Sequence, residues 1–253
     1  MKNKLFNKSI PIGSWLQIGD PEFTSIMIQS GFDFLVIDME HGTISERGLP
    51  ALFEVFKGTN CVPMVRVAKN DQILIRRVLD LGAKGIIVPG VNSKKDVIKA
   101  ENAIFYPPKG ERGIGFSKAN NYGIGFKEYF KTSNNNVLFI IQIEHSTAVK
   151  NINEIFSSNN IDAYIIGPYD LTGSMGIVGE FSNPQYIQNL DIIKSAAEKN
   201  GIRSGIHIVW PEIEELKKVV SEGYKFIAYS TDALLLHEKC NYDLMKISAL
   251  KQK

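Results

Sequence analysis

Side chains that could bind a metal ion and move protons lie directly at the ends of short apolar runs. Asp38 and His41 follow one run, Arg66 ends another, Glu144 follows a third, and Asp170 follows a fourth. Two carboxylates that converge repel each other unless a cation lies between them. Oxygen donors of this kind suit Mg²⁺ or Mn²⁺, and Co²⁺ also fits. We therefore predict that Glu144 and Asp170 bind one divalent metal ion.

Taken singly, each of these residues has an ordinary structural explanation. A carboxylate in this position often caps the next helix, and Asp170 could do so together with the nearby Thr172 and Ser174. His41 could be a surface histidine, and Arg66 could be half of a structural ion pair. Their joint occurrence at one end of the apolar runs indicates a functional site, because the opposite ends carry no such collection.

Eight short apolar runs alternate with longer amphipathic segments along the whole chain. The predicted strands are 12–18, 34–39, 62–67, 85–90, 137–143, 163–167, 205–208 and 226–229. Several are continuously apolar and rich in Val and Ile, which is typical of strands covered on both faces. Helix starts are predicted at 20–21, 70–71, 183–184 and 211, and the matching helices are expected to stop at the glycines 31, 82, 201 and 223.

This alternation predicts a parallel sheet, and eight strands in 253 residues match a (β/α)₈ TIM barrel. A doubly wound open sheet is the alternative, but no G-x-G-x-x-G motif follows the first run. In a barrel, the carboxyl ends of all strands meet at one mouth, where catalytic residues collect. Gln142 and Glu144 are two residues apart, so both side chains can point into that mouth.

We expect a single domain over residues 1–253, because no linker or low-complexity tract divides the chain. One connection, at about 91–136, is longer than the others. It contains a predicted helix at 93–103, a turn-rich stretch at 106–113 and a predicted polar turn at 132–136. A long ordered connection of this kind is typical of a lid or a subunit contact.

The composition excludes several other classes of protein. Lys and Arg total 29 against 27 for Asp and Glu, and no basic cluster stands out, so we expect no nucleic-acid partner. No stretch has the ~18 apolar residues of a membrane span, and residues 1–10 lack the apolar core of a signal peptide. Two cysteines are too few for a disulfide framework, which makes the reducing cytoplasm the expected compartment.

A set of motifs in fixed order gives the sequence a resemblance to a known family. The motifs are GFDFLVIDMEHG at 31–42, VRV at 65–67, LDLGAKGI at 79–86, VP at 88–89, YPPKGERG at 106–113, QIE at 142–144, GPYDL at 167–171 and SMG at 174–176. Each is weak alone, but the set resembles the HpcH/HpaI family of divalent-metal, pyruvate-dependent class II aldolases, such as hydroxy-oxo-heptanedioate aldolase. The resemblance implies a TIM barrel of the phosphoenolpyruvate/pyruvate type, usually a hexamer built from dimers that exchange their last helix.

The resemblance also implies roles for individual residues. Glu144 and Asp170 match the family's metal ligands, and Arg66 matches the arginine that contacts the 2-oxo acid. His41, paired with Asp38, matches the dyad that moves protons, and Gln142 matches a pocket residue beside the metal. The backbone amides around Tyr169 and Asp170 match the group that binds the substrate carboxylate. The resemblance assigns no role to Glu40, for which we favour a structural ion pair. Three departures concern the acceptor substrate: Tyr169 stands where the family has a small residue, 116–123 lack an arginine that many relatives carry, and His145 replaces a frequent threonine.

Together, the residues and the resemblance predict a carbon–carbon lyase. It would cleave a 4-hydroxy-2-oxo acid reversibly to pyruvate and an aldehyde, through a metal-stabilised pyruvate enolate. A Schiff-base mechanism is disfavoured because residues 161–167 contain no lysine. One alternative is a synthase on the same scaffold that condenses an enolate donor with an oxo acid, as a citrate synthase does. The others are a CoA-ester lyase and a barrel retained only for binding or assembly.

Overall fold

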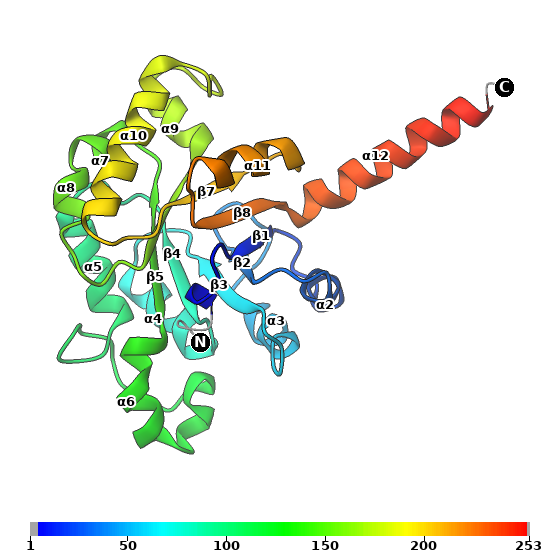
Figure 1. Ribbon diagram of the computed structural model, residues 1–253. Helices are drawn as coiled ribbons and strands as arrows, with labels where there is room; N and C mark the ends of the chain where they lie inside the picture. The colour runs from blue at the N-terminus through cyan, green and yellow to red at the C-terminus, as the bar shows by residue number, and fades with distance from the viewer. Residues whose placement is uncertain (1–4, 252–253) are drawn as a thin grey trace.

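Eight parallel strands close into a barrel in the computed structural model of the protein, which describes residues 5–251 (Figure 1). In chain order they are β1 (Ile12–Leu16), β2 (Phe34–Asp38), β3 (Val62–Arg66), β4 (Gly85–Val88), β5 (Leu138–Ile143), β6 (Ala163–Ile166), β7 (Gly205–Ile208) and β8 (Phe226–Thr231). Strands that follow each other in sequence are neighbours in the barrel, and β8 closes on β1. The TIM barrel is therefore confirmed, and the alternative of an open doubly wound sheet is wrong. Residues 1–4 of the segment 1–10, in which no signal peptide is expected, lie outside the described residues.

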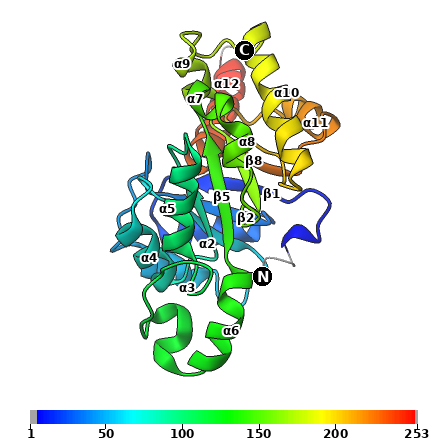
Figure 2. The same ribbon diagram turned by 90° about the vertical axis from the view of Figure 1, so that its left-hand side faces the viewer.

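Helices surround this barrel (Figures 1 and 2). They are α2 (Pro21–Gln29), α3 (Leu49–Val55), α4 (Gln72–Leu81), α5 (Lys94–Ile104), α6 (Phe126–Asn136), α7 (Ser146–Lys150), α8 (Ile152–Ile155), α9 (Pro168–Ser174), α10 (Pro184–Lys199), α11 (Ile213–Ser221) and α12 (Asp232–Lys251). Three of the four predicted helix starts are confirmed, at α2, α4 and α10. At α4, for example, the carboxylate of Asp71 accepts the backbone N–H groups of Ile73 and Leu74, both at 3.0 Å, and so caps the helix. Helix α11 starts at Ile213, two residues after the start predicted at Pro211.

The long connection at 91–136 holds α5, the 3₁₀ helix η1 (Lys118–Gly123) and α6. Residues 132–136, expected to form a polar turn, are instead the last part of α6, so that prediction is wrong. The reason is a tertiary contact. Asn134 Oδ1 accepts the Tyr106 N–H at 2.8 Å, and Asn134 Nδ2 donates to the Tyr106 carbonyl at 3.0 Å. Because this pair of hydrogen bonds satisfies a peptide group 28 residues away in sequence, it stabilises a helix where the local composition favours a turn.

The side chains of β2 show how the core positions the site. Phe34 and Val36 belong to the apolar cluster that fills the inside of the barrel. Leu35 and Ile37 point the other way and pack in the cluster beneath the helices. The next inward position along the strand is Asp38, at its carboxyl end. The same alternation that buries the core therefore puts a carboxylate at the mouth of the barrel.

Gly205, at the start of β7, lies where no side chain fits. A Cβ atom at this position would be 2.2 Å from the carbonyl oxygen of Tyr164 and 2.9 Å from Phe226 Cδ1. We expect Gly205→Ala to lower the free energy of unfolding by about 1–3 kcal/mol, because the strands must separate to admit the methyl group. Urea unfolding measures this loss. Gly115→Ala is the control, because nothing lies within 4 Å of a Cβ there; equal stability of the two variants would contradict the close packing.

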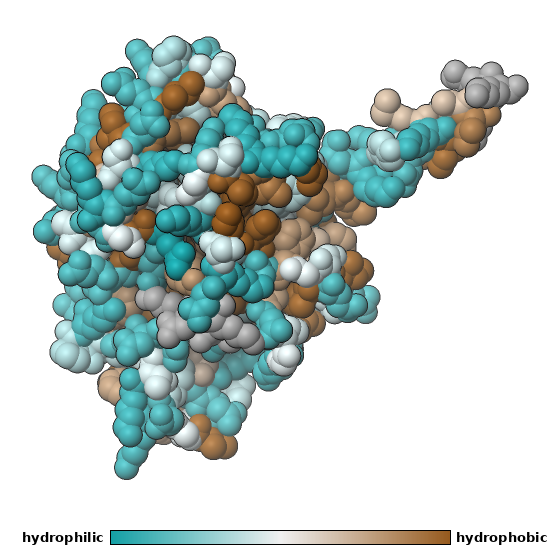
Figure 3. Space-filling model, in the orientation of Figure 1, coloured by the Kyte–Doolittle hydropathy of each residue, from teal (hydrophilic) through white to brown (hydrophobic). Residues whose placement is uncertain are grey.

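Helix α12 projects away from the barrel after β8 (Figure 1). It starts from Asp232, whose carboxylate accepts the backbone N–H groups of Gln17 at 3.0 Å and Ile18 at 2.9 Å, and so joins the ends of β8 and β1. Farther along, Leu244 and Met245 are exposed, and hydrophobic side chains line part of the projecting helix (Figure 3). Even so, none of the helices in residues 5–251 is long and apolar enough to cross a membrane.

Candidate active site

Four strand ends bring the predicted site residues together at the mouth of the barrel. Asp38 and Arg66 end the neighbouring strands β2 and β3 and are partners in their register. Glu144 directly follows β5. Asp170 lies in the first turn of α9, which is separated from the end of β6 only by its cap residue Gly167. Residues that are distant in sequence thus share one edge of the barrel, because all eight strands run in the same direction.

The strongest contact at the mouth is a buried pair between Arg66 and Asp38. Arg66 Nε donates to Asp38 Oδ1 at 2.9 Å, and Arg66 Nη2 donates to Asp38 Oδ2 at 2.7 Å. Asp38 is fully buried and Arg66 is 8% exposed. Burial alone would raise the pKa of Asp38, but the Arg66 guanidinium and the backbone N–H groups of His41 and Glu40 together hold that pKa below its usual value. The carboxylate therefore stays ionised and fixes the plane of the guanidinium.

The remaining edge of the Arg66 guanidinium faces the interior of the mouth. Its Nη1 lies 3.1 Å from Glu40 Oε2 in an ion pair and 3.4 Å from Gln142 Oε1. The expected ion pair of Glu40 is thus present, and its partner is the central arginine of the site. Burial raises the pKa of Glu40; Arg66 opposes this shift, whereas the nearby Glu144 carboxylate adds to it. Arg66 is therefore held from several sides, with one nitrogen directed toward the metal-binding candidates.

His41 lies in the turn after β2 and is exposed. Asp38 Oδ1 accepts its backbone N–H at 3.2 Å and that of Glu40 at 3.1 Å. Asp38 thus holds the turn that carries His41, but through the main chain, because Arg66 binds both carboxylate oxygens. The predicted dyad between the His41 and Asp38 side chains stays a prediction.

Glu144 is joined to its neighbours through both carboxylate oxygens. Its Oε1 accepts the backbone N–H of Gly90 at 2.6 Å, and its Oε2 accepts a hydrogen bond from Gln142 Nε2. Since Gln142 also contacts Arg66, a continuous row of polar contacts runs from Asp38 through Arg66 and Gln142 to Glu144. Gln142 is 2% exposed, and this buried side chain contacts both Arg66 and Glu144.

Asp170 is exposed in the first turn of α9 and does not cap that helix. The cap residue is Gly167, which makes no side-chain cap bond, so the capping explanation for Asp170 does not apply. Gly167 also packs against Glu144: a Cβ built on it would be 3.2 Å from Glu144 Cβ and 3.5 Å from Glu144 Oε2. The absence of a side chain at Gly167 lets the start of α9 lie directly against Glu144.

The donor chemistry at this edge fits a hard divalent cation. Glu144 and Asp170 offer only oxygen atoms, and Mg²⁺ and Mn²⁺ commonly take one or two carboxylates and complete their shell with water and substrate oxygens. Within residues 5–251, no group of three or more His, Cys, Asp and Glu side chains is arranged as a metal cluster.

Trp15 belongs to the site, although no motif in the sequence marks it. The Cζ atom of Arg66 lies 4.4 Å from the centre of the Trp15 ring, and the centres of the Trp15 and His207 rings are 5.2 Å apart. Burial lowers the pKa of His207 to about 3, and the positive charge of Arg66 acts in the same direction, so this imidazole is neutral. The guanidinium therefore packs on an uncharged aromatic ring, and the cation–π attraction helps to hold it in place.

His145 has a structural role that explains its position next to Glu144. Its Nδ1 atom accepts the backbone N–H of Thr147 at 3.0 Å and caps α7. The side chain itself is exposed. The histidine thus shapes the turn that follows the predicted metal ligand.

The strands of this barrel place a buried arginine and several carboxylates at one mouth, which is where TIM-barrel enzymes carry their active sites. The chain belongs to the HpcH/HpaI aldolase/citrate lyase family, whose model matches residues 12–238. The resemblance seen in the sequence motifs is thereby confirmed.

Curated relatives and solved structures narrow the class further. The chain is 33% identical over 232 residues to a 5-keto-4-deoxy-D-glucarate aldolase of Escherichia fergusonii, covering 91% of this chain and 90% of the relative. It is 34% identical over 238 residues to a 2-dehydro-3,6-dideoxy-6-sulfogluconate aldolase of Pseudomonas putida, covering 94% and 92%. The crystal structure of the citrate synthase SbnG superposes with a TM-score of 0.89 at 25% identity, covering 100% and 99%. The aldolase relatives support a carbon–carbon lyase.

Proposed function

We propose that this protein is a class II aldolase that cleaves a 4-hydroxy-2-oxo acid reversibly to pyruvate and an aldehyde. The observation that carries the proposal is the row of contacts from Asp38 through Arg66 and Gln142 to Glu144, with the start of α9 against its end. This row presents a fixed positive charge and anionic oxygens side by side, which is what an oxo acid and a divalent cation require. The similarity to two aldolases supports the same reaction type.

In this proposal, Glu144 and Asp170 hold Mg²⁺ or Mn²⁺, with Co²⁺ as a further candidate. When bound, the ion supplies Lewis acidity that stabilises negative charge on the oxo acid. Arg66 places a second, fixed positive charge beside the keto oxygen, and Asp38 prevents it from rotating away. The backbone amides around Tyr169 and Asp170 bind the substrate carboxylate, and Gln142 orients the oxo-acid end.

His41 moves the proton in this proposal. In the cleavage direction, the imidazole takes the proton of the C4 hydroxyl group, directly or through a water molecule. The electron pair of that O–H bond forms the aldehyde carbonyl, and the C3–C4 bond breaks. Its electrons remain on the pyruvate fragment as an enolate, which gains a proton at C3 to give pyruvate. The exposed position of His41 leaves its ring accessible to substrate and water.

A cleavage assay tests the proposal. The purified protein is offered a panel of 4-hydroxy-2-oxo acids, and pyruvate release is followed with a coupled dehydrogenase, with and without EDTA and with added Mg²⁺, Mn²⁺ or Co²⁺. We expect release that EDTA abolishes and divalent ions restore. Absence of pyruvate release from every substrate would contradict the aldolase. Net condensation of an enolate donor with oxaloacetate would favour the synthase, the second candidate, which the similarity to the citrate synthase supports.

We further propose a homo-oligomer, a hexamer built from three dimers whose subunits exchange α12. The exposed apolar side chains along this projecting helix support the exchange, because a second copy would bury them. The test is the oligomeric state in solution: a monomer in light scattering would contradict the proposed assembly.

We also propose the cytoplasm as the compartment, and the free thiols of Cys61 and Cys240 are compatible with it.

A further inference from the structure

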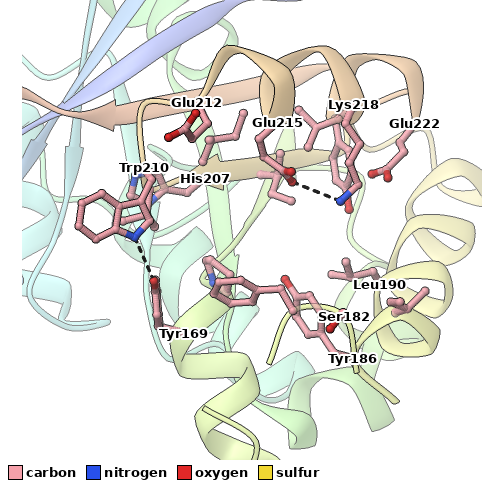
Figure 4. Close-up of a pocket in the computed structure, with 18 of the residues that line it drawn as sticks. Tyr169, Ser182, Tyr186, Leu190, His207, Trp210, Glu212, Glu215, Lys218 and Glu222 are labelled. Carbon is pink, nitrogen blue, oxygen red and sulfur yellow. Dashed lines mark hydrogen bonds and ion pairs between the residues drawn. The ribbon is translucent and has the colours of Figure 1, made fainter. Parts of the chain in front are cut away.

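A large cavity lies beside the mouth of the barrel, between α10 and α11 (Figure 4). Its volume is about 840 Å³, enough for a ligand much larger than pyruvate. Its walls are mainly aromatic and aliphatic, and they include Phe181, Tyr186, Leu190 and His207. None of the residues proposed for the chemistry on the oxo-acid side lines it, apart from Tyr169. The cavity is therefore additional to the row of contacts that would hold the oxo acid.

Two aromatic side chains lie at the end of this cavity that is on the mouth side of the barrel. Tyr169 directly precedes Asp170 in α9, and Trp210 follows the end of β7 by two residues, so both lie on the mouth side. Figure 4 shows them facing each other at one end of the cavity, where Trp210 Nε1 donates to the Tyr169 hydroxyl at 3.4 Å. This bond is at the long limit for a hydrogen bond, so a ligand can replace it at little cost. The Phe181 ring lies edge-on to Tyr169, with centroids 5.1 Å apart.

A second contact, between His207 and Trp15, links the cavity to the site. His207 lines the cavity, and its ring packs on Trp15, which supports Arg66. These contacts place one lining residue of the cavity next to the aromatic ring that supports Arg66. Tyr169 and Trp210 on the mouth side, and His207 beside Trp15, are the residues that relate this cavity to the site.

The charged groups around the cavity are mostly acidic. They are Asp191, Glu212, Glu215 and Glu222, with Lys194 and Lys218 as the cations. Lys218 is 3.5 Å from Glu215 in an ion pair, and Lys194 donates to the backbone carbonyl of Glu222. Both cations are thus already engaged by neighbouring groups, and the acidic side chains are in excess. A ligand group with a negative charge would be repelled, whereas an uncharged aromatic group could pack on the ring-lined walls.

We propose that this cavity binds the aldehyde-derived end of the substrate and selects uncharged, apolar or aromatic groups over anionic ones. Tyr169 and Trp210 are the specificity-determining side chains at its entrance. The proposal rests on the proposed aldolase function and adds the substrate class: 4-hydroxy-2-oxo acids with an apolar tail.

Two synthetic substrates of equal chain length test the selection. 4-Hydroxy-2-oxo-6-phenylhexanoate carries a phenyl ring where 4-hydroxy-2-oxoheptanedioate carries a carboxylate. We expect kcat/KM of the metal-loaded wild-type protein to be roughly tenfold or more higher for the phenyl substrate. Trp210→Ala should remove most of this preference, because it removes the ring that packs at the entrance, whereas Trp210→Phe should retain it.

Replacing an acidic residue of the cavity by lysine tests the selection in the opposite direction, because it should favour the anionic substrate. Glu212→Lys should raise kcat/KM for the heptanedioate relative to the phenyl substrate, because it replaces an acidic group of the cavity by a cation. Glu214→Lys is the matched control, since Glu214 lies on the same helix but outside the cavity, where it pairs with Lys217. Equal effects of the two reversals would overturn the proposal.

Failure of the cavity proposal can be distinguished from failure of the aldolase proposal. Exchange of deuterium from D₂O into the methyl group of pyruvate requires no aldehyde and reports only the oxo-acid side. Normal exchange without a preference for the phenyl substrate, or with a preference that Trp210→Ala leaves intact, overturns the cavity proposal alone. Loss of exchange in the metal-loaded wild-type protein overturns the aldolase proposal and, with it, the inference that rests on it.

Discussion

Replacing Glu144 by glutamine is expected to lower metal-dependent cleavage by at least about 100-fold, because metal ions supply several kcal/mol of transition-state stabilisation. Glutamine keeps the shape of the side chain, and its carbonyl oxygen can still accept the Gly90 N–H bond. It lacks the negative charge that a divalent cation needs. Asp170→Asn should have the same effect, since it removes the other carboxylate of the pair. The free energy of unfolding should change by less than about 1 kcal/mol in both variants.

Binding of Mn²⁺ measures this expectation independently of turnover. The electron paramagnetic resonance signal of free Mn²⁺ decreases when the ion binds, so titration of each variant gives its affinity directly. Glu154→Gln is the matched control, because Glu154 is an exposed residue of α8 on the outside of the barrel. Wild-type affinity in Glu144→Gln and Asp170→Asn would sink the assignment of both residues as ligands, whatever happens to the activity.

The barrel could be predicted from the sequence because its signals are local. A continuous run of Val and Ile residues marks a buried strand wherever it occurs, and caps such as Asp71 mark helix starts. The order of these signals then leaves few folds to choose between. The mouth residues followed from the same reasoning, since a parallel barrel collects the residues that end its strands.

The contacts within the site could not be predicted in this way, because they depend on register and on side-chain direction. The family resemblance implies a pair between the side chains of Asp38 and His41, and that pair stays a prediction. What the sequence did not reveal is that the register of β2 and β3 sets Asp38 opposite Arg66, so that the guanidinium binds both carboxylate oxygens. No local pattern of residues encodes that register.

Tertiary contacts also account for the features that the sequence did not reveal. The hydrogen bonds between Asn134 and Tyr106 stabilise a helix in a segment with turn-like composition. The cavity beside the mouth is lined by residues of both α10 and α11, and Trp210 reaches Tyr169 only because β6 and β7 are neighbours. A tryptophan in a loop gives no sign of this contact in the sequence.

Replacing Arg66 is expected to stop enolate formation, and the choice of substitute decides what is learned. Arg66→Ala leaves the fully buried Asp38 carboxylate without its partner, which costs about 3–5 kcal/mol of stability and confuses a catalytic loss with an unfolded protein. Arg66→Lys keeps the positive charge but not the planar fork that binds both oxygens of Asp38. It therefore tests the position of the charge at a smaller cost in stability.

In Arg66→Lys, we expect deuterium exchange into the pyruvate methyl group to fall by about 10²–10³-fold, the range for losing one fixed donor to a developing anion. Arg203→Lys is the control: Arg203 also stacks on a ring, that of Phe6, and donates to the Phe6 carbonyl, but it lies before β7 at the other end of the barrel. Urea unfolding of both variants separates lost catalysis from lost structure. Since the aldehyde takes no part in the exchange, a normal rate in a folded Arg66→Lys variant would remove the guanidinium geometry from the mechanism, while the metal and cavity proposals would stand.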